Sequence, residues 1–115
     1  MRKFGLPRAE ILKKSLDIKR VFKEGLWIQA THVNVYALSE NSTKFAVSLS
    51  RRIKGAARRN RIKRWIREIY RKRKHELPDE RWLLFYIPED NRSLSYQWIN
   101  DEIGSLIPKL TRLLK

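Results

Sequence analysis

Hydrophobic and polar residues alternate strictly in two stretches of the chain, and this alternation predicts two strands. In residues 32–38, Val33, Val35 and Ala37 alternate with His32, Asn34 and Tyr36. Residues 44–50 repeat the pattern, with Phe45, Val47 and Leu49 on one side. A period of two is typical of a strand that buries one of its faces.

Two further stretches read as extended. The run WLLFYI at 82–87 has no polar alternation and ends at Pro88. A short apolar run of this kind favours a strand covered on both faces. The stretch LWIQAT, which precedes the first alternating strand, also reads as extended.

Apolar residues recur at helical spacing in three other segments. Residues 16–24 carry a narrow stripe, with Ser15 placed to cap the helix and Gly25 to end it. A helix is also expected from Ser95 onward, where Pro108 inside the pattern predicts a kink or an early break. The stripe of this last helix comprises Ile99, Ile103, Leu106, Ile107, Leu110, Leu113 and Leu114.

The middle helix lies between the strands at 44–50 and 82–87. Its stripe is Ile62, Trp65, Ile66 and Ile69, with Tyr70 at the edge. Because a helix connects these two strands, they should be parallel neighbours in one sheet. The sequence therefore predicts a single α+β domain over residues 1–115: a two-layer α/β sandwich with about four strands, in the order αβββαβα.

Charge is concentrated on the middle helix and the residues before it. Residues 51–74 contain thirteen Lys or Arg and one acid, a net charge of +12, while the whole 115-residue chain carries +15. Like charges at i,i+4 spacing destabilise a helix by a few tenths of a kcal/mol per pair, roughly. A polyanionic partner, nucleic acid before anionic membrane, would offset this repulsion.

A helical wheel separates the two kinds of residue on this helix. Opposite the apolar stripe lie Asn60, Arg64, Arg67 and Arg71, flanked by other basic residues. Guanidinium groups bind phosphates in bidentate fashion, and an amide can bind a base edge or a 2′-hydroxyl. Membrane-surface or calmodulin-type binding would instead expose the apolar stripe, which the core requires.

Catalysis by the chain itself is not expected. The acids are scattered over separate elements, and the two His residues lie on different segments. A protein nuclease would need clustered carboxylates for Mg²⁺, or a His pair. The chain has no Cys, which fits a reducing cytoplasm. Two other classes remain open: a ribosomal or general RNA-binding protein without a nuclease, and a helix-turn-helix DNA reader, which is disfavoured because a strand precedes the basic helix.

The segment SRRIKGAARRNRIKRWIREIYR resembles the arginine-rich motif of the bacterial ribonuclease P protein subunit. The similarity extends to LKKSLDIKRVFKEG, which resembles the N-terminal helix of that family, and to the strands THVNVYAL, KFAVSLS and WLLFYIP. The resemblance implies a fold like domain 2 of ribosomal protein S5, with a left-handed βαβ crossover.

The resemblance also implies a function. Members of this family are non-catalytic subunits of a ribonucleoprotein that removes the 5′ leader of precursor tRNA. The RNA carries the Mg²⁺-dependent chemistry, and no cofactor is expected on the protein itself. The basic helix would bind the ribonuclease P RNA, in a 1:1 complex with a protein monomer. A cleft between the first helix and the sheet would bind the leader.

Carried onto this sequence, the resemblance predicts two sets of contacts. Contacts with the catalytic RNA are expected from Arg51, Arg52, Arg58, Arg59, Asn60, Arg61, Lys63, Arg64, Arg67 and Arg71. Contacts with the leader are expected from Ile18, Phe22, Tyr36 and Ser48, the aromatic rings by stacking.

Some of these residues depart from the family or have a second interpretation. Ile18 stands where the family often has Phe, and Lys54-Gly55 replaces the usual Gly-Lys order, so the tight turn can shift by one residue. Phe22 on a helical stripe can serve the core as well as a stacking platform. The four Trp residues are interpreted as packing residues, Trp65 foremost.

Overall fold

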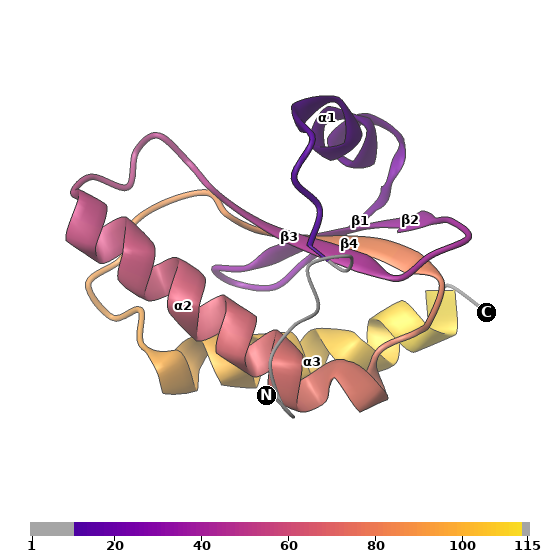
Figure 1. The fold of residues 1–115 in the computed structure, drawn as a ribbon. Coiled ribbons are helices and arrows are strands. Elements are labelled where there is room, and N and C mark those ends of the chain that lie inside the picture. The colour runs from indigo at the N-terminus through magenta and orange to yellow at the C-terminus, as the bar shows by residue number, and fades with distance from the viewer. Residues whose placement is uncertain (1–10, 114–115) are drawn as a thin grey trace, which may run out of the picture.

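The fold is built on one sheet that has helices on both of its faces (Figure 1). The structure, a computed structural model, describes residues 11–113. Its elements are α1 (Ser15–Glu24), β1 (Leu26–Gln29), β2 (Asn34–Ser39), β3 (Lys44–Leu49), α2 (Ala56–Arg73), the short 3-10 helix η2 (Lys74–Glu76), β4 (Arg81–Ile87) and α3 (Tyr96–Leu113). This order confirms the predicted αβββαβα arrangement.

The sheet has four strands in the order β1-β2-β4-β3. β1 pairs antiparallel with β2, and β2 pairs antiparallel with β4. β3 and β4 are parallel, as the helix that connects them predicts. β4 is an inner strand with Leu83, Leu84 and Phe85 buried, which confirms the interpretation of WLLFYI as a strand covered on both faces.

Helices α2 and α3 cover one face of the sheet, and α1 lies over the other (Figure 1). The larger core cluster lies between the sheet and the pair α2–α3 and includes Phe45, Phe85 and Ile103. A smaller cluster, which includes Val21 and Leu84, lies between the sheet and α1. The two faces of the sheet are therefore available for different tasks.

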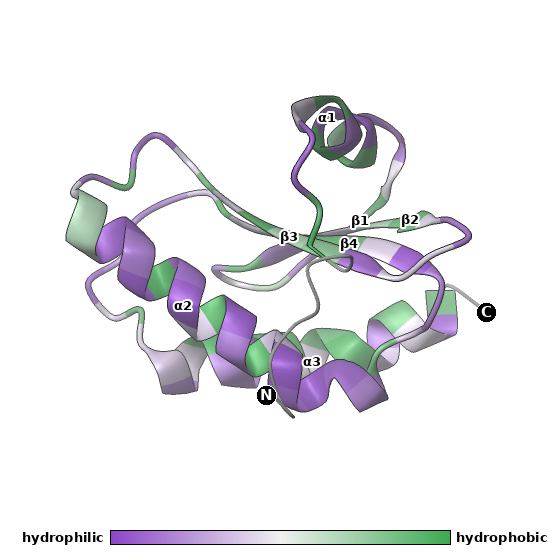
Figure 2. Ribbon diagram, in the orientation of Figure 1, coloured by the Kyte–Doolittle hydropathy of each residue, from purple (hydrophilic) through white to green (hydrophobic). Residues whose placement is uncertain are grey.

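The apolar stripe of α2 anchors a helix that is otherwise hydrophilic (Figure 2). Ile62, Ile66 and Ile69 are fully buried, and Tyr70 joins them, its ring stacked 4.0 Å from that of Phe45. Burial of one such side chain contributes about 1.5–3 kcal/mol. This exceeds the few tenths of a kcal/mol, roughly, that each like-charged i,i+4 pair costs.

The two ends of α1 differ from the prediction. Lys14, not Ser15, is the N-cap, and the Ile18 amide donates to its carbonyl at 3.1 Å. No side chain caps the helix, because the ammonium group of Lys14 has no acceptor for a backbone amide. Gly25 follows the last helical residue as predicted, but its φ of −70° is not left-handed. Glycine is needed there because a Cβ would lie 2.5 Å from the Val21 carbonyl oxygen.

The predicted early break at Pro108 is wrong, since α3 continues to Leu113. Leu106 and Leu110 are buried on either side of the proline. Their burial offsets the cost of an internal proline, about 3 kcal/mol. Leu114, placed on the same stripe from the sequence, lies outside the described residues.

Candidate RNA interface

The loop between β3 and α2 is held in shape by a glycine and an arginine. Gly55 precedes α2 with a φ of 89°, a conformation that favours glycine, so the tight turn lies at this residue of the Lys54-Gly55 pair. The Arg59 guanidinium donates to the carbonyls of Ser50 and Ile53, both at 2.9 Å. The loop therefore presents Arg51 and Arg52 to solvent from a fixed base.

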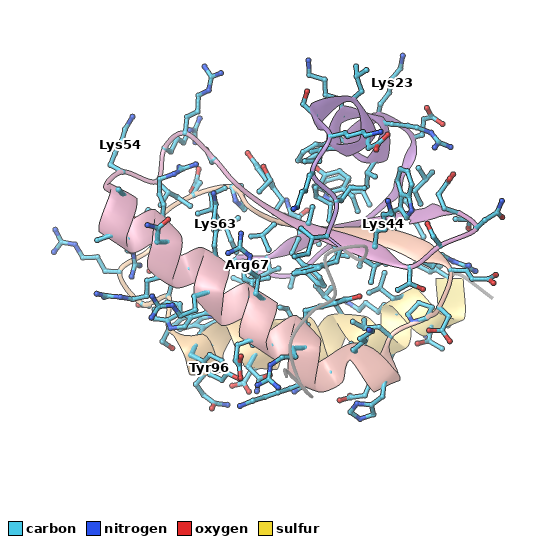
Figure 3. All side chains as sticks on the ribbon, in the orientation of Figure 1. Lys23, Lys44, Lys54, Lys63, Arg67 and Tyr96 are labelled. Atoms are coloured by element: carbon cyan, nitrogen blue, oxygen red, sulfur yellow. The ribbon has the colours of Figure 1, made fainter. Side chains whose placement is uncertain are left out.

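The outer side of α2 presents a row of side chains with no hydrogen bond or ion pair among the described residues. We call this row the basic face; it comprises Asn60, Arg61, Lys63, Arg64 and Arg67, of which only Lys63 is half-buried. Figure 3 labels Lys63 and Arg67 along α2, and Lys54 on the loop before it. Arg51 in that loop likewise has no partner within residues 11–113. These groups are free to bind an external anion.

The other four predicted RNA contacts are already engaged within the chain. Arg58 and Arg59 flank the buried stripe rather than facing away from it. The ion pairs are Arg52–Glu89 at 2.8 Å, Arg58–Asp90 at 3.1 Å and Arg71–Glu68, and Arg59 binds the two carbonyls described above. The hydrogen bond from Arg71 holds the pKa of Glu68 below its ordinary value.

A group of aromatic side chains lies between α1 and the sheet, and we call it the aromatic face. It comprises three aromatic rings, those of Phe22, Tyr36 and Tyr86, together with the hydroxyl-bearing side chain of Ser48. The Phe22 ring meets Tyr36 edge-on at 4.8 Å and Tyr86 at 5.5 Å, and Ser48 pairs with Tyr86 across β3 and β4. Ile18 packs against the same cluster. The four predicted leader contacts thus lie around one surface.

Each ring of the aromatic face is partly exposed and partly packed. Phe22 is half-buried, so it serves the small core and remains accessible as a platform. Burial, with a smaller effect of Tyr86, raises the pKa of Tyr36 above its ordinary value. A tyrosine hydroxyl is protonated at neutral pH even at its ordinary pKa, so Tyr36 can donate a hydrogen bond.

Two aromatic residues of this surface are not predicted as contacts from the sequence. The apolar run of β4 predicts a buried Tyr86, although strand alternation places it on the face of Trp82 and Leu84. The sequence predicts that Trp27 packs, but it is 55% exposed. No sequence signal distinguishes an exposed Trp on an edge strand from a buried one.

Two of the other three Trp residues pack against the hydrophobic core. Trp82 is buried, and Trp65 packs against the larger core. Trp98 is 39% exposed, but its indole donates to Glu102 at 2.5 Å.

Glu102 is a buried acid that holds α3 to the turn between β1 and β2. Its carboxylate accepts from the backbone amides of His32 at 2.6 Å and Val33 at 3.0 Å, and it contacts the His32 ring at 2.7 Å. Burial raises the pKa of Glu102, but these hydrogen bonds together bring it below the ordinary value. His32, predicted within the first alternating strand, lies outside β2 because its ring is engaged here.

Within residues 11–113, no three His, Asp or Glu side chains gather closely enough to hold a metal ion. In the same part of the chain, no helix combines the length and apolar character needed to cross a bilayer.

The sequence matches the model of the Ribonuclease P family over residues 6–111. The chain belongs to the ribonuclease P protein family. The resemblance seen in the arginine-rich segment is thereby confirmed. Among relatives, the chain is 30% identical over 102 residues to the ribonuclease P protein component of Pelotomaculum thermopropionicum, covering 87% of this chain and 91% of that protein. It is 32% identical over 111 residues to that of Thermotoga petrophila, covering 94% and 92%.

Solved structures of this family share the fold. The ribonuclease P protein of Staphylococcus aureus aligns with a TM-score of 0.77 at 21% identity, over 94% of this chain and 97% of that one. The protein from Thermotoga maritima aligns with a TM-score of 0.75 at 22% identity, over 87% and 96%. These alignments confirm the predicted fold class.

Proposed function

We propose that this chain is the protein subunit of a ribonuclease P and takes part in tRNA processing. In this proposal the basic face binds the catalytic RNA, and the aromatic face binds the 5′ leader of precursor tRNA. The observation that carries it is a row of basic side chains that have no partner among residues 11–113, on a chain of the ribonuclease P family. The alternative of a general RNA-binding protein without a nuclease is not favoured by the family.

The arrangement of the two faces supports two separate RNA contacts. α2 and α1 lie on opposite sides of the sheet (Figure 1), so the basic face and the aromatic face do not compete for one ligand. They approach each other at the end of β3, where Ser48 is followed by the loop that carries Arg51 and Arg52. One RNA can bind along α2 while a single strand passes over the sheet.

We further propose that the chemistry belongs to the RNA. The protein contributes charge neutralisation and leader binding, in a 1:1 complex in the cytoplasm. Magnesium is assigned to the RNA, where neutralised phosphates lower the concentration required for activity. No side chain of this chain is given a role at the reacting phosphate.

Reconstitution tests this proposal. A bacterial ribonuclease P RNA and a precursor tRNA are combined at a Mg²⁺ concentration at which the RNA alone is inactive, with and without the protein. We expect the protein to restore cleavage at the mature 5′ end. Tight RNA binding without any gain in cleavage would instead identify a general RNA-binding protein.

A further inference from the structure

We propose that the aromatic face continues onto the edge strand β1 and forms a further nucleotide position there. Trp27 stacks on a base of the single-stranded leader, and the Asn34 side-chain amide hydrogen-bonds to the edge of the same base. This inference rests on the proposed function, because it assigns one more position to the leader-binding surface.

Trp27 has the exposure and orientation that a stacking residue needs. It lies on β1 directly opposite Tyr36 of β2, and the two rings are almost parallel, 19° apart with centroids separated by 6.4 Å. With 55% of its surface exposed, the indole is one of the largest apolar groups that the fold leaves in solvent. Any of the four bases can stack on such a ring, because every base has a flat π face.

Asn34 supplies the polar group. It is only 7% exposed, and its side-chain amide has no hydrogen-bond partner among residues 11–113. The polar atoms of this amide are not among the fully buried, unpartnered side-chain atoms of residues 11–113, so solvent, and hence a ligand, can reach them. An amide both donates and accepts, and a base edge offers matching groups.

The strand register brings these two groups to one place. Asn34 and Tyr36 are two residues apart on β2, so their side chains lie on the same face as α1. Trp27 pairs with Tyr36, which makes it the diagonal neighbour of Asn34, at a separation of about 7–8 Å between backbone positions. A base stacked on Trp27 is therefore within reach of the amide.

A hollow lies beside this position, around the turn that follows β1. Gln29, which pairs with Asn34, lines a hollow of about 260 Å³ together with Thr31, His32, Pro88 and Glu89. The carboxylate of Glu89 is paired with Arg52 at 2.8 Å, so the positive charge of Arg52 reduces its repulsion of a phosphate.

The test uses the reconstituted holoenzyme and two probes, a precursor tRNA with a single-stranded leader and the same tRNA without a leader. We expect Trp27→Ala to weaken binding of the leader-bearing probe about tenfold, the size of one lost stacking contact. Asn34→Leu, which keeps the side-chain volume but removes the amide, should weaken binding of the same probe severalfold. Neither change should alter binding of the leaderless tRNA.

Matched controls separate stacking from a general loss of structure. Leu26→Ala removes another exposed apolar side chain from β1, on the opposite face of the strand, and should leave both probes unaffected. Precursor tRNAs with a single abasic site at successive leader positions locate the contact. At one position, the abasic site should weaken binding to the native holoenzyme but not to the Trp27→Ala holoenzyme. If each abasic site weakened binding to the native and the Trp27→Ala holoenzymes by the same factor, the inference would be overturned.

Failure of the inference can be told from failure of the proposed function. If Tyr36→Ala loses the preference for leader-bearing tRNA but Trp27→Ala and Asn34→Leu keep it, the leader binds the aromatic face and the position on β1 does not exist. If the native holoenzyme shows no preference for the leader at all, the leader assignment itself is wrong.

Discussion

Arg59 and Arg64 both lie on the basic helix, yet their surroundings give them different roles. The guanidinium of Arg59 binds two carbonyls of the preceding loop, whereas Arg64 points to solvent without a partner in the described part of the chain. The sequence predicted both as RNA contacts, because a motif records residue types and not the loop that folds back on them. The same limit explains why the sequence predicts a packing role for Trp27.

This difference predicts opposite effects of two replacements. Arg59→Ala should lower the free energy of unfolding by about 1–3 kcal/mol, since it removes charge-assisted hydrogen bonds at a partly buried site. Arg64→Ala should change it by no more than about 0.5 kcal/mol, as is usual for an exposed position. Urea unfolding at neutral pH measures both. Equal stability of the two variants would show that Arg59 does not anchor the loop.

At the scale of the elements, the sequence predicts the three α-helices and the four strands but not the 3-10 helix η2. Each predicted element carries an apolar stripe or alternation that the rest of the fold buries. The errors lie where tertiary contacts decide the outcome. Pro108 is tolerated inside α3 because buried residues on both sides hold the helix against the sheet. The buried Glu102 was not singled out, since its partners His32 and Val33 lie about 70 residues away along the chain.

The Glu102 cluster predicts a pH-dependent loss of stability. The folded state lowers the pKa of Glu102 below its ordinary value of 4.5. Its contribution is therefore complete above that value and is lost as the pH falls through the lower folded pKa. Glu102→Gln should cost about 1–3 kcal/mol near pH 7, by loss of charge-assisted hydrogen bonds, and much less near pH 3.

Unfolding measured by urea at both pH values tests this expectation. Asp101→Asn is the matched control, because Asp101 is an exposed acid on the same helix. Its effect should be small at both pH values. A cost of Glu102→Gln that did not change with pH would mean that the carboxylate is not ionised in the folded protein.

At the scale of the whole molecule, the sheet separates two surfaces of different chemistry. The sequence predicted the basic one from charge alone, and the resemblance supplied the aromatic one. Neither could show that the two lie on opposite sides, since this depends on which face of the sheet each helix covers (Figure 1). The net charge of +15 remains largely uncompensated in the free protein.

This uncompensated charge predicts stabilisation by anions. Millimolar sulfate should raise the Tm of the free protein, because an anion bound to the basic face stabilises only the folded state. A gain of 1 kcal/mol corresponds to about 4 °C for a domain of this size. Thermal unfolding with chloride at equal ionic strength is the control. The gain should shrink in a variant that combines Arg64→Gln and Arg67→Gln, and an unchanged gain would place the anions elsewhere.

The central claim is that two faces of one small protein bind two different RNAs, and a paired binding measurement tests it most directly. Arg64→Gln and Tyr36→Ala are compared for affinity to the ribonuclease P RNA alone, and then, as saturated holoenzymes, for affinity to precursor tRNA with and without its leader. The account predicts that Arg64→Gln weakens only the first affinity and that Tyr36→Ala weakens only the binding of leader-bearing tRNA. If either variant weakened both affinities to the same extent, the two faces would not act separately, and the account would be contradicted.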